Sequence, residues 1–217
     1  LARTQELWER KATLWHLRQI ADDGKQMPTL DQNGQGYCWA YSTTRGIMYA
    51  RAMQNQPYRR LSGHAIGCMV KNFRDEGGWN GLSYKFGMER GVPSVEFWKE
   101  KSMSRENDNP ATWENAAGNK IAEGYFDPSV AVYDQNLTRR QRMTLLCLCI
   151  PYMADRNRWS HSTLDHTPVI LDNEVWPMGD NSWTDGWGDM GTYTFQGTSM
   201  DRVDGATAVR VINASVN

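Results

Sequence analysis

Hydrophobic residues recur at helical spacing near the start of the chain. Residues 4–21 are amphipathic, and their apolar stripe contains Leu7, Leu14, Leu17 and Ala21. Steps of three, four and seven residues place these side chains on one face of a helix. We therefore predict an N-terminal helix that packs on its own domain or contacts a partner protein.

The chain then alternates between loop-like and helical patterns up to about residue 125. Residues 25–37 are polar and contain glycine, which predicts a loop, and apolar residues return at roughly helical spacing from Cys38 onward. A glycine-rich turn is expected at Gly77–Gly81 and a short helix near 84–90. Residues 101–125 lack periodicity and are interpreted as a surface loop.

Short apolar runs separated by turn residues dominate the second half of the chain. These runs are residues 130–133, 145–150, 168–171, 191–195 and 208–212. Their pattern is typical of strands in a small antiparallel sheet or barrel. A helix-rich first half followed by a strand-rich second half predicts an α+β protein with two lobes.

Composition excludes several classes of function. The 217 residues carry 24 Lys and Arg against 25 Asp and Glu, a formal net charge of −1, so the basic surface expected of a nucleic-acid-binding protein has no support. The longest apolar run, 145–150, is far shorter than the roughly 20 residues that span a bilayer. We therefore expect neither a nucleic-acid partner nor a membrane span.

The four cysteines do not form a disulfide pattern. Cys38, Cys68, Cys147 and Cys149 are irregularly spaced, and a chain of this length needs no disulfide to fold. All four are predicted to be unpaired. This favours a reducing, cytoplasmic location, or association with a larger particle, over secretion.

Cys38 is the candidate nucleophile because it stands where a loop turns into a helix. The amide dipoles at a helix N-terminus stabilise a thiolate, but attack also requires a base and a group that orients the base. We prefer His166 as the base because an apolar strand follows it directly, while His161, five residues earlier among polar neighbours, is a rival. Asn181 can accept an imidazole N–H and orient the ring.

These residues lie in segments that resemble the papain-like cysteine peptidases. The run Gln32–Ser42, QNGQGYCWAYS, is similar to the family's nucleophile segment Q-G-x-C-G-S-C-W-A-F-S. Asp165-His166 before an apolar strand resembles its histidine segment, and residues 181–193, NSWTDGWGDMGTY, resemble its asparagine segment. The order Cys, His, Asn and the spacing of roughly 130–150 residues also fit.

The resemblance implies a role for each matching residue. Cys38 would be the nucleophile, His166 the base, and Asn181 the residue that orients it. Gln32 would donate to the oxyanion together with the backbone N–H of Cys38. Trp183 would shield the histidine–asparagine hydrogen bond and, with Gly77 and Gly78, would line the substrate site. Neither a cofactor nor a metal is implied.

The chain departs from the family pattern around the cleft. Gln35 replaces a disulfide-forming cysteine, and Gly77–Gly81 lacks the cysteine of the family's G-C-x-G-G element, so its register is open. Bulky Tyr37 precedes the nucleophile, and Thr184 replaces a glycine. These changes concern cleft width and substrate specificity.

Two functions remain open at this stage. The first is a thiol-dependent hydrolase, an endopeptidase that cleaves peptides or proteins through an acyl-enzyme on Cys38. The second is a catalytically silent papain-like module in a larger assembly such as a virus particle. In either case we expect an N-terminal helical extension over residues 1–26 and a papain-like domain over 27–217. Its helical lobe would cover about 27–125 and its antiparallel, barrel-like lobe about 126–217, with the site in the cleft between them.

Overall fold

The fold was obtained as a computed structural model. It describes residues 29–156, 160–189, 191–194, 196–197 and 202–213. The helix predicted at 4–21, and with it the proposed contact to a partner, lies outside the described residues. The division into an extension and a domain at residue 26 therefore remains a prediction.

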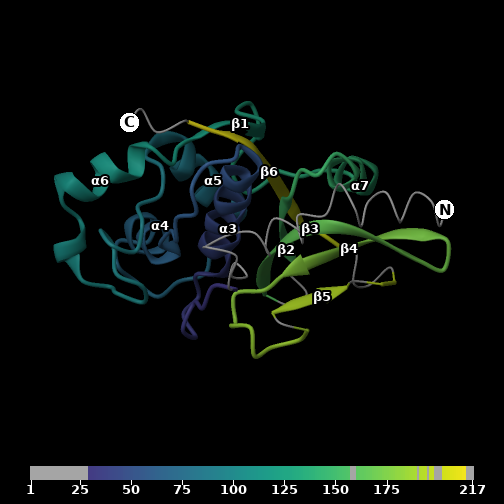
Figure 1. The fold of residues 1–217 in the computed structure, drawn as a ribbon, viewed down its shortest axis with the longest axis horizontal. Coiled ribbons are helices and arrows are strands. Elements are labelled where there is room, and N and C mark those ends of the chain that lie inside the picture. The colour runs from purple at the N-terminus through teal and green to yellow at the C-terminus, as the bar shows by residue number, and fades with distance from the viewer. Residues whose placement is uncertain (1–28, 157–159, 190, 195, 198–201, 214–217) are drawn as a thin grey trace.

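Helices α4, α5 and α6 lie at one end of the molecule, with α3 between them and the sheet, whereas α7 packs against β2, β3 and β4 away from them (Figure 1). The described helices are α3 (Cys38–Met53), α4 (Gly63–Val70), α5 (Asn80–Glu89), the 3-10 helix η1 (Arg105–Asn107), α6 (Pro110–Ala117) and, later in the chain, α7 (Arg139–Cys147). Every residue of α3 from Cys38 to Arg51 is buried. The helix that carries the candidate nucleophile is therefore the central element of the fold.

The second half of the chain builds one antiparallel sheet. Its strands are β1 (Ile121–Tyr125), β2 (Tyr152–Arg156), β3 (His161–Leu171), β4 (Glu174–Asp180), β5 (Thr192–Thr194) and β6 (Gly205–Ile212). They are ordered β1-β6-β2-β3-β4-β5, so the C-terminal strand β6 lies between the first two. The predicted α+β class is confirmed, and every described helix except α7 precedes the strands.

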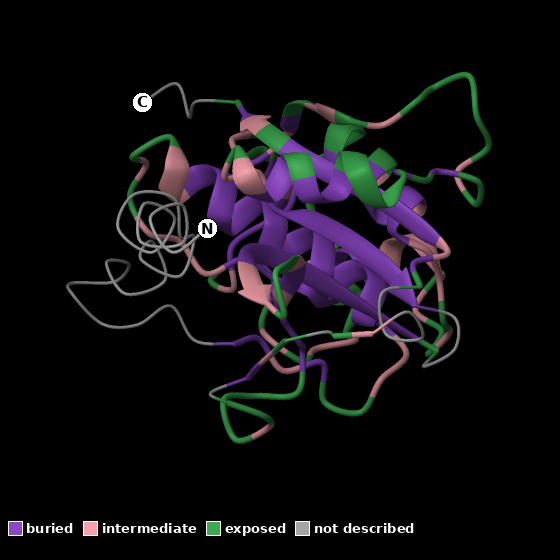
Figure 2. Ribbon diagram, turned by 90° about the vertical axis from the view of Figure 1, so that its right-hand side faces the viewer, coloured by how far each residue is buried: buried purple, intermediate pink, exposed green. Residues whose placement is uncertain are grey.

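Alternate residues of the central strands point into two hydrophobic clusters. Met153 and Val209 belong to the cluster that contains α3, whereas Tyr152 and Ala208 belong to the cluster under α7. This is the two-residue period of a strand covered on both faces. Figure 2 shows the buried residues running through α3 and the central strands, with exposed residues mainly in the surrounding loops. No helix among the described residues has the length and apolar character to cross a bilayer.

Three predicted elements were wrong. Residues 145–150, expected to be a strand, form the end of α7 and the turn after it. Residues 130–133 form turns and bends. The segment 101–125, interpreted as a loop, contains α6 and β1; the helix begins with the Asn109 side chain accepting from the Thr112 backbone N–H and with Pro110 at its first position.

Candidate active site

A cleft of about 530 Å³ opens beside the start of α3. Six of the residues that line it concern the predicted site: Gln32, Cys38, Gly77, Gly78, His161 and Trp183. They come from the loop before α3 and the first residue of that helix, the loop before α5, the start of β3 and the loop after β4. The cleft therefore collects residues that are up to 151 positions apart in the sequence.

Cys38 is the first residue of α3 and is 8% exposed. Burial raises the pKa of its thiol, while polar contacts with Ser162 and with the backbone N–H of Trp39 act in the opposite direction. The net effect favours the neutral thiol. Attack by this sulfur therefore requires a nearby base that takes the proton.

His161, not His166, is the histidine that contacts Asn181. The His161 Nε2 atom lies 2.7 Å from the Asn181 side-chain oxygen, which also accepts from the Ser182 backbone N–H at 2.6 Å. Since an amide oxygen only accepts, Nε2 carries the proton and Nδ1 is the nitrogen that can accept one. Burial lowers the pKa of His161, which favours this neutral, basic form.

The indole of Trp183 covers the same pair. Its ring centroid lies 4.6 Å from that of His161, and Trp187 contacts it edge-on at 5.4 Å. Trp183 itself is 43% exposed. The tryptophan thus lies between His161 and solvent. The resemblance implied this shielding position for Trp183, but over His166.

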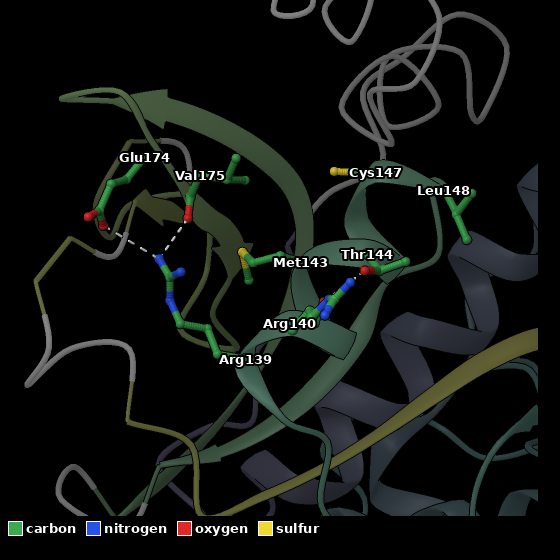
Figure 3. A pocket seen from close by; sticks show the side chains of 8 residues that line it. All are labelled: Arg139, Arg140, Met143, Thr144, Cys147, Leu148, Glu174 and Val175. Carbon is green, nitrogen blue, oxygen red and sulfur yellow. Dashed lines mark hydrogen bonds and ion pairs between the residues drawn. The ribbon is translucent and has the colours of Figure 1, made fainter. Parts of the chain in front are cut away.

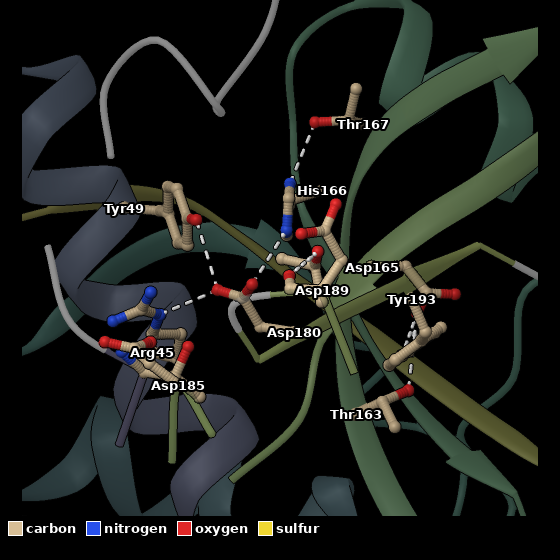
Figure 4. Close-up of polar contacts among 12 residues, drawn as sticks. Arg45, Tyr49, Thr163, Asp165, His166, Thr167, Asp180, Asp185, Asp189 and Tyr193 are labelled. Carbon is tan, nitrogen blue, oxygen red and sulfur yellow. Dashed lines mark hydrogen bonds and ion pairs between the residues drawn. The ribbon is translucent and has the colours of Figure 1, made fainter. Parts of the chain in front are cut away.

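The predicted pairing of His166 with Asn181 is contradicted by the structure. His166 is fully buried, with Nδ1 2.8 Å from the Thr167 hydroxyl and Nε2 3.1 Å from Asp180 Oδ1. Its ring stacks on Tyr49 in α3 (Figure 4). Both ring nitrogens are therefore engaged in the core, and His166 is not among the residues that line the cleft.

Asp180 connects this buried cluster to the helix of the candidate nucleophile. Its Oδ2 atom accepts from Arg45 Nε at 2.9 Å and from the Tyr49 hydroxyl at 3.2 Å, both on α3 (Figure 4). Asp180 is the last residue of β4 and precedes Asn181 directly. A buried ion pair thus fixes the strand end that presents Asn181 relative to the helix that presents Cys38.

Gln32 is held by both sides of the cleft. Its Nε2 donates to the Gln35 carbonyl at 2.6 Å, and its Oε1 accepts from the Ser182 hydroxyl. The backbone N–H of Gln32 donates to the Ser182 carbonyl at 3.0 Å. A primary amide has two N–H groups, so one remains for a ligand while the other holds Gln35.

A hydrogen-bonded chain supports the loop before α3 at the position of the missing family cysteine. Gln35 Oε1 contacts His64 Nε2, and His64 Nδ1 lies 2.5 Å from the Tyr41 hydroxyl. His64 is fully buried, and burial lowers its pKa to about 4, so it stays neutral over most of the pH range. All four cysteines are free thiols.

Bulky Tyr37 does not occupy the cleft. Its side chain is fully buried, its hydroxyl donates to the Arg74 carbonyl at 2.8 Å, and its ring lies so close to Gly67 of α4 that a Cβ there would approach it to 2.5 Å. The side chain of Tyr37 therefore does not narrow the cleft.

The glycine-rich element divides at the start of α5. Gly77 and Gly78 line the cleft, whereas Gly81 lies inside the helix. A Cβ on Gly78 would come within 2.5 Å of the Trp39 ring, while one on Gly77 would meet nothing within 4 Å. Packing against Trp39 therefore requires glycine at 78, and Gly77 leaves its backbone open toward the cleft.

A second hollow lies between α7 and the start of β4 (Figure 3). Arg139 bridges it by donating to the Val175 carbonyl at 3.0 Å, and Cys147 contributes a thiol. Burial raises the pKa of that thiol. None of the described residues that line this hollow is a histidine, whereas His161 lines the cleft together with Cys38.

No protein-family model and no curated protein sequence matches this chain. Solved structures do. Xylellain, a cysteine protease from Xylella fastidiosa, matches with a TM-score of 0.66 and 16% identity over 86% of this chain and 83% of its own. Digestive procathepsin L2 from the larval midgut of Tenebrio molitor matches with a TM-score of 0.68 and 16% identity.

The chain has the papain-like fold. The match to procathepsin L2 covers 92% of this chain and 66% of that protein, and procathepsin L 3 from the same midgut gives a TM-score of 0.64 at 14% identity. The papain-like fold predicted from the segments around Cys38 and Asn181 is thereby confirmed. It extends over most of the chain although few residues are identical.

Proposed function

We propose that the chain is a cysteine peptidase in which Cys38 is the nucleophile, His161 the base and Asn181 the residue that orients it. The observation that carries the proposal is the 2.7 Å contact between His161 Nε2 and the Asn181 amide oxygen, in a cleft that Cys38 also lines. A peptide or protein is the substrate class that a papain-like fold with this residue set implies.

The residues that line the cleft together support a two-step acyl transfer. Nδ1 of His161 takes the proton of the Cys38 thiol as the sulfur attacks the carbonyl carbon. The imidazolium then donates that proton to the leaving amine as the C–N bond breaks, which leaves a thioester on Cys38. Water attacks the thioester with His161 again acting as base, and the C–S bond breaks to release the acid and the thiol.

Two donors are available for the negative charge that develops on the carbonyl oxygen. The backbone N–H of Cys38 belongs to the first turn of α3, where amides have no partner within the helix. The second N–H of the Gln32 amide is the other donor. Loss of one such donor typically slows acyl transfer by a factor of about 100–1,000.

The substrate backbone has a place on the other wall of the cleft. Gly77 is open, and Gly78 follows it along the same edge. We assign these two residues to binding an extended peptide by main-chain hydrogen bonds. Because glycine has no side chain, the substrate backbone can approach their main-chain groups closely.

Two measurements test this function: the rate at which a reagent alkylates the thiols, and the rate at which the parent and matched variants hydrolyse a substrate. Iodoacetamide should label Cys38 faster than the other three thiols, and Cys38→Ala should abolish hydrolysis of a casein or peptide-library substrate. His161→Ala should lower turnover by about 100-fold or more, the usual contribution of a general base. His166→Ala, checked for folding by circular dichroism, serves as the control.

Three results would contradict the proposal. These are hydrolysis by Cys38→Ala equal to that of the natural sequence, labelling of all thiols at similar rates, and a His161→Ala variant as active as the parent. Slow, unselective labelling together with absence of hydrolysis would support the silent structural module instead.

A further inference from the structure

Asp155 is a buried carboxylate in the wall of the cleft. It lies in β2, faces Ser162 of β3 and Gly205 of β6 across the sheet, and is 4% exposed. It lines the same cleft as Cys38 and His161. The cleft therefore presents an acidic group beside the candidate nucleophile, a feature that none of the motif segments contains.

The partners of Asp155 are neutral. Its Oδ1 atom accepts from the Ser162 hydroxyl at 2.5 Å, and the Asn80 backbone N–H lies 3.0 Å from Oδ2 and 3.3 Å from Oδ1. Within the part of the chain that the structure describes, no Lys, Arg or His forms an ion pair with it. A carboxylate accepts about four hydrogen bonds, so acceptor capacity remains.

The neighbouring arginine does not supply the missing charge. Arg156 also lines the cleft, but its guanidinium pairs with the buried Asp165 at 2.5 Å. On the other side, a Cβ at residue 205 would come within 2.9 Å of Asp155 Oδ2, so Gly205 provides the room that this carboxylate occupies. Asp155 thus has no cationic partner among the described residues.

We propose that Asp155 forms a cation-binding subsite of the cleft and selects substrates with a lysine or arginine side chain near the scissile bond. This inference rests on the proposed peptidase function and names its substrate class. Buried charges are otherwise paired in folded proteins, and a guanidinium or ammonium group of the substrate would complete the pair.

The ionisation of Asp155 agrees with this role and makes it dependent on pH. Burial raises the pKa of Asp155 to about 7; the Ser162 and Asn80 hydrogen bonds oppose the rise and the charge of Asp204 adds to it. The charged and titratable groups that face it are Cys38 from α3 and Asp204 from the segment before β6. Preference for a cation should therefore increase as pH rises through about 7.

A purely structural role is the competing explanation. The contact with the Asn80 backbone places Asp155 at the first residue of α5, where a negative charge stabilises a helix. A test must therefore compare a cation with its neutral counterpart in one protein, because loss of a structural role would slow both equally.

Two matched alkylating probes make that comparison. Both are chloroacetamides on a four-carbon chain, one ending in guanidine and the other in the neutral, nearly isosteric urea. Rates of Cys38 labelling would be measured by mass spectrometry for the full chain, Asp155→Asn and Glu76→Gln. Glu76 is a carboxylate next to Gly77 that pairs with Arg74 at 3.2 Å and has a side chain 43% exposed, so its variant controls for general electrostatic attraction.

The ratio of guanidine to urea rates decides the question. At about pH 8 we expect at least about a tenfold preference for guanidine in the parent, as for a hydrogen-bonded charge pair. The ratio should fall to near one in Asp155→Asn and persist in Glu76→Gln. In the parent alone, which requires no variant to fold, the ratio should rise between about pH 6 and pH 8.

A ratio near one in the parent at about pH 8, or one that survives Asp155→Asn, would overturn the inference. Hydrolysis that depends on Cys38 together with a ratio near one would overturn only the subsite and leave the peptidase intact. The expected ratio without any hydrolysis would overturn only the peptidase. Failure of both probes to label Cys38 would contradict both.

Discussion

Replacing Asp155 by asparagine should change how the stability of the protein depends on pH. The carboxylate is 4% exposed and lacks a cationic partner among the described residues. Its pKa rises from 3.8 to about 7 on folding because burial disfavours the charged form. Asparagine has nearly the same shape and hydrogen-bonding groups as the protonated acid, so the substitution isolates the effect of the charge.

The sign and size of the effect follow from the two pKa values. Below about pH 4 the acid is protonated in both states and contributes no pH dependence. As pH rises to about 7 the unfolded chain releases the proton more readily than the folded one, so folding stability falls. The full loss is about 4 kcal/mol, since each tenfold change in proton affinity is worth about 1.4 kcal/mol.

Urea unfolding between about pH 5 and pH 8 measures this loss. The free energy of unfolding of Asp155→Asn, relative to the parent, should rise by about 2–3 kcal/mol over that interval. Glu76→Gln removes a carboxylate whose side chain is 43% exposed, and it should show a difference that stays nearly constant. A constant difference for Asp155→Asn as well would show that this carboxylate is charged at little cost in the folded state, and the reasoning would fail.

Two further pairs of variants test the site. His166→Ala should lower the free energy of unfolding by about 1–3 kcal/mol, because it leaves the buried Asp180 with one donor fewer, while thiol labelling in the cleft stays fast. His161→Ala should slow thiol labelling and change the free energy of unfolding less. Identical behaviour of the two variants would refute the assignment of His161 as the base. Gly78→Ala should cost about 1–3 kcal/mol in urea unfolding by overpacking against a tryptophan of α3. At Gly77 an added Cβ meets open space, so Gly77→Ala should lower the free energy of unfolding much less. Equal losses for the two variants would show that the close approach to the tryptophan ring does not constrain residue 78.

The sequence predicted the position of Cys38 at a helix start correctly but paired the wrong histidine with Asn181. Cys38 begins a helix and Asn181 follows a strand, as expected. The error arose because an apolar run was taken to mark the start of the strand. β3 begins five residues earlier, at His161, and its polar residues are buried because they pair across the sheet: Ser162 with Asp155, and Asp165 with Arg156. A strand that is buried with such polar pairs does not show a hydrophobic pattern in the sequence.

Helix α7 was missed for a different reason. Its apolar end, residues 145–150, was read as a strand, and the preceding residues looked merely polar. A start signal was nevertheless present: Thr138 and Gln141 have the spacing of a capping box, and in the structure each side chain contacts the other's backbone N–H. The proposed cation subsite at Asp155 had no such signal, because its burial and its lack of a cationic partner among the described residues arise only in three dimensions.

The contact of Gln35 with His64, and of His64 with Tyr41, has a practical consequence. These neutral hydrogen bonds support the loop before the nucleophile where a covalent cross-link would otherwise be expected. Reagents such as dithiothreitol, which keep Cys38 in its thiol form, therefore have no bond in the described structure to break. We therefore expect the wall of the cleft to keep its structure under strongly reducing conditions and the protein to refold without an oxidation step.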